Sequence, residues 1–385
     1  MNPRSYILFC AGEDSGDILG SEAVAAVCSM GFSAKGAGGV RMLDAGLEPL
    51  IPYENLPVSG FGDVLPRYFC FRKYFEILCK ALKDPFCKAF IAIDYPGFNM
   101  RLMAEADRFS KPVFYIAPPQ IWAWKHNRGS HFANRSVAVL FEMEREVYER
   151  FGALATRLCH PFLEAAKKLP LKDKHLREDE ILLLPGSRLG QVRRNKPLYE
   201  AIAKLLQQEA SLTPVIIASR PALVPVLEKM FAHQYEVRLS PKKANLRAEF
   251  FANAKAVLSA PGTATLESTL CGTPVLVCAR IDPLTYFAGK CFLKTSFLAI
   301  PNILLNRSLI AEIIVPSTAS ITKTAMIALQ QIQRLSVESF ELSAKDIFPK
   351  LEGETLENWV REKVKGASKN WFAGMKSSEV EPEQE

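Results

Sequence analysis

Acidic and hydroxyl side chains follow two short apolar runs in the first half of the sequence. Glu13, Ser15 and Asp17 lie in AGEDSGD, directly after the run YILFC, and Asp94 opens DYPGFN after the run AFIAI. A carboxylate at the carboxyl end of a strand can cap the following helix or act as a general base toward a hydroxyl group. Two interpretations therefore stay open: a set of polar helix caps, or a site for a hydroxyl-bearing ligand such as a sugar.

The second half carries two segments suited to a diphosphate. Arg188 ends the turn PGSR after the run ILLL, and a predicted helix over residues 263–271 follows the segment AVLSAPG. A guanidinium group binds phosphate in a bidentate manner, and the first N–H groups of a helix point toward an anion. The alternative for this helix is an ordinary capped crossover between strands. The candidate phosphate-binding residues are Gly186, Ser187, Arg188, Gly262, Thr263 and Ala264.

Glu267 lies one turn into the predicted helix, and Gly272 follows its end. A carboxylate offers two adjacent acceptor oxygens, so Glu267 could accept both hydroxyl groups of a ribose. Its alternative is a solvent-exposed carboxylate on the helix surface. Gly272 suits the C-terminal cap of the helix, because glycine adopts a left-handed conformation at little cost.

Short apolar runs followed by turns of small residues recur along both halves and predict the elements that position these groups. Strands separated by helical stretches are typical of βαβ units on a parallel sheet, so the class is α/β. A basic connector over residues 161–179 separates the halves. We expect domains over residues 1–165 and 166–345. A helical segment at 346–376 should pack on the N-terminal domain or a partner subunit, and the acidic tail 377–385 should be disordered.

Composition excludes disordered, collagen-like and small disulfide-rich proteins. The 385 residues have ordinary globular proportions and a net charge of +7, which suits anionic partners. The nine cysteines show no metal-ligand spacing, so we expect neither a structural metal nor a disulfide. No apolar run approaches the roughly 18 residues of a transmembrane helix. Any membrane contact should therefore be peripheral.

A series of motifs resembles bacterial lipid-A-disaccharide synthases in order and spacing. They are AGEDSGDILG at 11–20, GVRM at 39–42, AIDYPGFN at 92–99, IWAW at 121–124, LPGSR at 184–188, GTATLES at 262–268, GTPVLV at 272–277 and the segment 284–304. The resemblance covers about residues 5–320. It implies a GT-B glycosyltransferase fold, in which two Rossmann-like domains face each other across a cleft. It also implies inverting transfer of 2,3-diacylglucosamine from its UDP derivative to 2,3-diacylglucosamine 1-phosphate (lipid X), with a β(1→6) linkage in the product.

The resemblance assigns roles to individual residues. Asp94 resembles the general base, and Arg188 would neutralise the leaving diphosphate. If the base is another residue, Glu13 or Asp17 is next in line. Glu267 and Asn302 would hold the nucleotide. The implied acceptor-binding residues are Ser15, Asp17, Asn99 and Trp124. We expect no cofactor, no metal and no nucleic-acid partner.

The implied setting is the cytoplasmic face of the inner membrane of a Gram-negative-type bacterium, with peripheral attachment and a possible homodimer. Residues 64–82 predict an amphipathic helix with positive charge suited to anionic headgroups. Phe71, Phe75 and Leu78 should lie mostly in the core. The residues expected at the bilayer surface are Val64, Leu65, Tyr68 and Phe69.

The chain departs from the family pattern at Gly97, where a second acidic residue is usual, and at Glu142, Cys159 and Gln191. Any role shared between two carboxylates would fall on Asp94 alone. Two alternatives remain. One is a UDP-N-acetylglucosamine 2-epimerase, which shares the fold and the UDP site. The other is a nucleotide-lipid binding protein without transferase activity.

Overall fold

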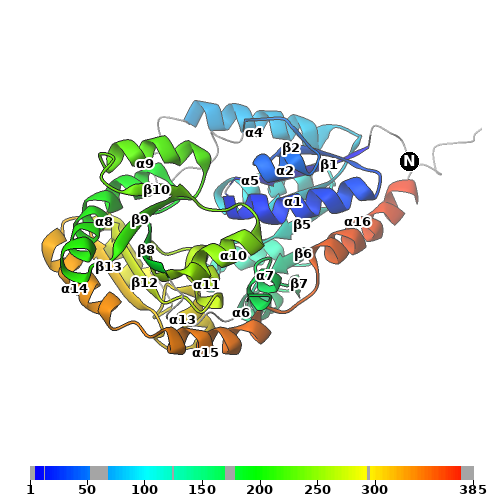
Figure 1. The fold of residues 1–385 in the computed structure, drawn as a ribbon. Helices are drawn as coiled ribbons and strands as arrows, with labels where there is room; N and C mark the ends of the chain where they lie inside the picture. Colours follow the sequence, from blue (N-terminus) through cyan, green and yellow to red (C-terminus); the bar gives the residue numbers. More distant parts are fainter. Residues whose placement is uncertain are drawn as a thin grey trace, which may run out of the picture. The chain divides into compact units, whose positions relative to one another are not determined.

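The computed structural model describes residues 5–12, 14–52, 68–123, 125–169, 178–292 and 295–373. The chain divides into two compact units, which are coloured along the sequence in Figure 1. Unit 1 holds the residues up to His160 and those from Glu352 onward, and unit 2 holds Pro161–Leu351. The boundaries we expected from the sequence were 165/166 and 345/346. The predicted acidic tail 377–385 lies outside the described residues.

Unit 1 is built on a parallel seven-stranded sheet in the order β3-β2-β1-β4-β5-β6-β7. Alternate residues of β1 enter different cores: Leu8 packs on one face of the sheet, and Ile7 and Phe9 pack on the other. Both faces are covered, so the central strands are nearly continuous apolar runs. The strands are β1 (Tyr6–Ala11), β2 (Ser33–Ala37), β3 (Leu47–Pro49), β4 (Cys87–Ile93), β5 (Val113–Ile116), β6 (Ser136–Val139) and β7 (Leu154–Arg157).

Helices cover both faces of this sheet. On one face α16 packs against α1 and β4, where buried Trp359 meets Phe114 edge-on with ring centroids 6.4 Å apart. Helices α4, α5 and α6 contribute to the core on the other face. Figure 1 shows α16 beside α1 although the two lie far apart in sequence. The helices of unit 1 are α1 (Asp14–Ser29), α2 (Val40–Asp44), α4 (Tyr68–Lys83), α5 (Pro96–Arg108), η3 (His126–Phe132), α6 (Glu142–Arg150) and α16 (Leu356–Ala373).

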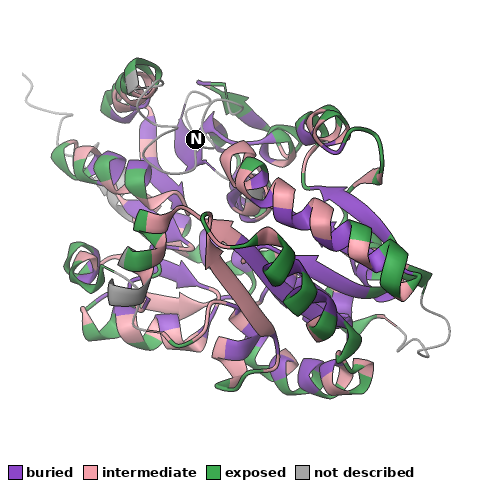
Figure 2. Ribbon diagram, turned by 90° about the vertical axis from the view of Figure 1, so that its left-hand side faces the viewer, coloured by how far each residue is buried: buried purple, intermediate pink, exposed green. Residues whose placement is uncertain are grey.

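Unit 2 repeats the plan with a parallel six-stranded sheet in the order β10-β9-β8-β11-β12-β13. Figure 2 shows that the central strands of both sheets are largely buried. The strands are β8 (Glu178–Leu184), β9 (Thr213–Ala218), β10 (Glu236–Leu239), β11 (Ala254–Ser259), β12 (Val275–Ile281) and β13 (Ala311–Pro316).

Helices α8, α9 and α14 pack on one face of this sheet, and α11 contacts α10, α13 and α15. The helices are α7 (Leu163–Lys167), α8 (Leu189–Ala210), η5 (Pro221–Leu223), α9 (Val224–Met230), α10 (Ala244–Asn253), α11 (Thr263–Leu270), α12 (Pro283–Phe292), α13 (Ile300–Leu305), α14 (Ile321–Gln333), α15 (Val337–Ile347) and η6 (Phe348–Leu351). Gly272, just beyond α11, has a φ of +65°, so its predicted capping conformation is confirmed.

Both sheets have the Rossmann order, in which the strand order reverses between the first and fourth strands. The fold class predicted from the sequence, α/β with two Rossmann-like domains, is confirmed. In such sheets ligands bind outside the carboxyl ends of the strands at the reversal point. These points lie between β1 and β4 in unit 1 and between β8 and β11 in unit 2.

Candidate functional site

Asp94 lies at the carboxyl end of β4, at the reversal point of unit 1. Its φ is +47° and that of Tyr95 is +51°, in the left-handed region that few residues other than glycine adopt. The Asp94 N–H donates to the carbonyl oxygen of Ile116 (2.9 Å), and its own carbonyl oxygen accepts from Asn99 Nδ2 and Tyr115 Oη, each at 2.8 Å. Strained backbone held by its surroundings is concentrated at functional sites. Asp94 combines such backbone with a place at the reversal point and is therefore the candidate base.

Ser15 reaches Asp94 from α1, on the other side of the reversal point. Its hydroxyl donates to Oδ2 of Asp94 at 3.3 Å, and both residues are half-buried. A donor in this position orients the carboxylate that the sequence indicates as a base. The structure thus brings together two of the predicted residues. Glu13 and Trp124 lie outside the described residues.

Asp17 and Asn99 hold the backbone around this point. The two carboxylate oxygens of Asp17 accept from the N–H groups of Arg41 and Met42, each at 3.1 Å, at the start of α2. Asn99 is fully buried, and its amide group donates to carbonyl oxygens at the ends of β1 and β4. The sequence predicted acceptor contacts for both residues. These hydrogen bonds link both side chains to backbone groups of unit 1, and the acceptor contacts stay a prediction.

Tyr115 is a residue that sequence reasoning missed. It lies in the middle of β5, and burial raises the pKa of its phenol well above the ordinary value. The hydroxyl therefore stays protonated and donates to the Asp94 carbonyl oxygen. An inward-facing tyrosine in an apolar strand also occurs in ordinary cores, so the sequence alone carries no signal for this contact.

In unit 2, the turn after β8 carries Arg188 as the N-cap residue of α8. Asn195 fixes the turn by donating through Nδ2 to the carbonyl oxygen of Pro185 at 2.7 Å. Gly186 has a φ of +131°, a backbone conformation that favours glycine, and a Cβ there would lie 2.4 Å from Oε1 of Gln191, so that side chain would have to shift. The residues Gly186, Ser187 and Arg188 are partly buried.

The N-terminus of α11 lies beside this turn. The N–H of Ala260 donates to the carbonyl oxygen of Leu184 at 3.0 Å, which joins the end of β11 to the end of β8. Gly262 and Thr263 are exposed, Ala264 is half-buried, and a Cβ at Gly262 would meet no atom within 4 Å. The first N–H groups of a helix have no partner inside it, and the positive end of its dipole lies there. The arrangement suits an anion next to Arg188.

Glu267 lies on the inner side of α11 and is only 9% exposed. Its carboxylate forms a bidentate ion pair with Arg247 of α10, with Nε–Oε2 and Nη2–Oε1 distances of 2.7 and 2.9 Å. The alternative of a solvent-exposed carboxylate is therefore wrong. The Arg247 guanidinium also lies 5.2 Å from the ring centre of Phe162. Sequence reasoning missed Arg247, because an arginine in an amphipathic helix carries no motif.

Asn302 does not have the surroundings of a nucleotide contact. It is fully buried, and its amide group donates to the carbonyl oxygen of Ile310 (2.8 Å) and to Glu312 Oε1 (2.9 Å). Its Oδ1 accepts from the N–H groups of Leu309 and Ile310 at 2.9 and 2.8 Å. These four hydrogen bonds use the full capacity of the amide. The predicted nucleotide contact is corrected to a structural link between α13 and β13.

Helix α4 contains part of the predicted membrane segment. Phe69 is 80% exposed, whereas Phe71 and Phe75 are partly buried against the core and Leu78 is fully buried. Val64 and Leu65 lie outside the described residues, as does the side chain of Tyr68. In the described part of the chain, we find no helix that is both long and apolar enough to span a bilayer. That part also contains no cluster of three or more His, Cys, Asp or Glu residues suited to a metal ion.

Solved structures with a similar fold include a putative UDP-N-acetylglucosamine 2-epimerase from Listeria monocytogenes, with a TM-score of 0.56 and 11% identity over 99% of both chains. The calicheamicin glycosyltransferase CalG4 has a TM-score of 0.52 and 13% identity over 95% of this chain and 98% of its own. These likenesses show the fold alone. Glycosyltransferases of this fold belong to the GT-B group, as the sequence predicted.

Sequence comparison is more specific. The family model described as Lipid-A-disaccharide synthetase matches residues 7–357. Lipid-A-disaccharide synthase 1 of Legionella pneumophila (strain Lens) is 30% identical over 328 residues, which are 81% of this chain and 84% of that protein. The lipid-A-disaccharide synthase of Coxiella burnetii (strain Dugway 5J108-111) is 29% identical over 311 residues, with 77% and 81% covered. This chain therefore belongs to the lipid-A-disaccharide synthetase family.

Proposed function

We propose that this protein is an inverting glycosyltransferase that joins UDP-2,3-diacylglucosamine and lipid X into the β(1→6)-linked lipid A disaccharide 1-phosphate and releases UDP. Family membership supports the reaction. The observation that carries the mechanism is the Asp94 carboxylate, held on strained backbone at the reversal point and bonded by Ser15. The epimerase alternative is not favoured, because its structural likeness extends only to the fold.

Asp94 acts as the general base toward the acceptor. It takes the proton of the sugar 6-hydroxyl as that oxygen attacks the anomeric carbon of the donor. The bond from this carbon to the diphosphate oxygen breaks on the opposite face, so the configuration inverts. Ser15, from α1, orients the carboxylate, and Asn99 and Tyr115 hold its backbone. Glu13 and Trp124 complete the proposed acceptor side.

Unit 2 receives the nucleotide. Arg188 and the N–H groups at Gly262, Thr263 and Ala264 stabilise the charge that grows on the leaving diphosphate. Gly186 and Ser187 shape the turn that carries the arginine. Glu267 fixes α11 against α10 through its ion pair with Arg247. A ribose bound by Glu267 would contact the same carboxylate that pairs with Arg247.

The substrates carry acyl chains, which places the reaction at a membrane surface. The exposed ring of Phe69 supports a contact at the start of α4, with Tyr68, Val64 and Leu65 as the other proposed members. The setting would be the inner face of the inner membrane, with peripheral attachment. A homodimer is compatible with this arrangement.

The test is a transfer assay with the two purified lipids. We expect a disaccharide 1-phosphate and one UDP for each molecule of product. Incubation with UDP-N-acetylglucosamine alone should give no manno isomer. A manno isomer without disaccharide would favour the epimerase, and UDP-lipid binding without either product would favour a binding protein.

A further inference from the structure

β5 lies next to β4 in the sheet, and one face of α6 holds the loop that follows β5. Tyr148 donates its hydroxyl to the carbonyl oxygen of Pro119 at 2.6 Å, and Trp122 Nε1 lies 3.4 Å from Glu144 Oε1. Glu144 and Tyr148 are four residues apart, so they project from the same side of the helix. Two side chains of α6 thus fix the backbone and one indole of this loop.

Glu144 is a buried carboxylate, only 7% exposed. Its second oxygen accepts from the N–H groups of Leu140 and Phe141 at 3.2 and 3.3 Å. The pKa of Glu144 is raised to about 7, mainly by burial and to a smaller extent by the charge of Asp94. A buried carboxylate with no cation among its described hydrogen-bond partners is costly to the fold, and such groups cluster at functional sites.

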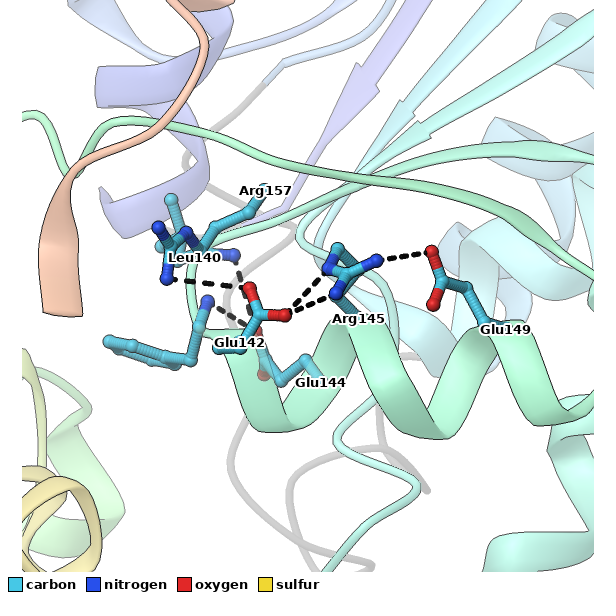
Figure 3. A network of polar contacts seen from close by, with 7 residues as sticks. Leu140, Glu142, Glu144, Arg145, Glu149 and Arg157 are labelled. Carbon is cyan, nitrogen blue, oxygen red and sulfur yellow. Dashed lines mark hydrogen bonds and ion pairs between the residues drawn. The ribbon is translucent and has the colours of Figure 1, made fainter.

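Glu142, two residues earlier, shows the ordinary alternative in the same turn. Its carboxylate lies between Arg145 and Arg157, and Arg145 also pairs with Glu149 (Figure 3). The hydrogen bond from Arg145 lowers the pKa of Glu142. Glu142 is therefore a charged surface group, and it offers a matched control for Glu144.

We propose that Glu144 is a positioning residue for the transfer reaction: through Trp122 it fixes the loop over residues 119–123, so that the acceptor sugar meets the base in the correct orientation. This loop follows β5, whose last residue, Ile116, accepts a hydrogen bond from the N–H of Asp94. Glu144 touches no reacting atom and acts through the indole. This inference rests on the proposed function. The proposed role of Glu144 adds to that function a structural link between α6 and the acceptor side of the site.

The experiment compares Glu144→Gln, Trp122→Phe, the double variant and the control Glu142→Gln. At pH 8, above the Glu144 pKa of about 7, we expect Glu144→Gln to raise the KM for lipid X about tenfold, the size expected from losing one hydrogen bond to a charged group. The KM for the UDP donor should stay within about twofold of wild type. Glu142→Gln should match wild type. The KM for lipid X in the double variant should not exceed the higher of the two single-variant values, because both changes break the same contact.

A spectroscopic readout tests the contact without turnover. The indole N–H resonance of Trp122, assigned by its loss in Trp122→Phe, should shift in Glu144→Gln and stay in place in Glu142→Gln. Equal KM values for both substrates in Glu144→Gln and wild type would overturn the inference, as would an unmoved indole resonance. If Glu144→Gln does not fold, Trp122→Phe must show the same selective rise in the acceptor KM. Wild-type protein without transfer would refute the proposed function, whereas active wild type with unaffected variants would refute only this inference.

Discussion

The carboxylates of unit 1 differ in their surroundings more than in their sequence context. Asp94 sits on left-handed backbone at a strand end, Asp17 caps a helix, and Glu144 is buried under a loop. All three follow or precede short apolar segments in the sequence. What separates them is the set of groups that surround each carboxylate in the folded chain.

The burial of Glu144 predicts a pH dependence of stability. Its pKa in the folded protein is raised from 4.5 to about 7, so the folded state holds the proton more tightly than the unfolded state. Its contribution is therefore fully present below about pH 4.5 and is lost as pH rises through about 7. Wild type should lose about 3 kcal/mol relative to Glu144→Gln over that range. Urea unfolding of both proteins at pH 4.5, 6 and 8 measures this. A difference that does not change with pH would contradict it.

Arg188 on unit 2 is predicted to act both in UDP binding and in catalysis. Arg188→Ala should weaken UDP binding and also lower kcat, because charge on the leaving diphosphate grows in the transition state. Calorimetric titration with UDP and single-turnover rates measure the two effects. Arg193→Ala, an exposed residue in the same helix, serves as the comparison. Unchanged UDP affinity in Arg188→Ala would remove this turn from the donor site.

At the scale of elements, the pairing of α10 with α11 predicts a large stability effect. Glu267→Ala leaves Arg247 buried without its carboxylate, which typically costs about 3–5 kcal/mol. Replacing both residues, as in Arg247→Met with Glu267→Leu, should restore part of the loss. Urea unfolding measures stability, and calorimetry measures UDP affinity. Full stability together with lost UDP affinity would instead make Glu267 a direct nucleotide ligand.

The central strands of both sheets are predictable from the sequence. The runs before AGEDSGD, DYPGFN, PGSR and APG are β1, β4, β8 and β11, because strands buried on both faces are nearly all apolar. Outer strands such as β3, β7 and β10 are short and carry exposed residues, and charged or polar residues interrupt their apolar runs. The reversal points and their loops follow from the central strands.

Only part of the candidate site is predictable in the same way. Asp94, Arg188 and Gly262 lie in turns that follow strands, and Ser15 lies in the first turn of the helix after β1, so the apolar runs before them mark all four positions in the sequence. Contacts such as Arg247–Glu267 and Trp122–Glu144 join separate elements and leave no periodic signal. The same limit explains Asn302, which lies in a family motif but serves the backbone around it.

At the scale of the whole molecule, the exposed ring of Phe69 predicts membrane binding. Phe69→Ser should lower partitioning onto vesicles of phosphatidylglycerol and phosphatidylethanolamine about tenfold or more, the loss expected for one buried phenylalanine. The melting temperature should change little, because the ring is 80% exposed. Leu154→Ser in the same unit, 61% exposed, is the control and should leave binding unchanged. Equal vesicle binding by all three proteins would place the membrane contact elsewhere.

The central claim is that Asp94 is the base of an inverting transfer. The most direct measurement is the single-turnover rate of disaccharide formation by wild type and Asp94→Asn, with UDP affinity measured on the same preparations. The account predicts a rate about 10²–10⁴-fold lower in the variant, with UDP affinity and folding retained, because the general base is lost and unit 2 is unchanged. A folded Asp94→Asn protein that forms the disaccharide within a few-fold of the wild-type rate would contradict the claim.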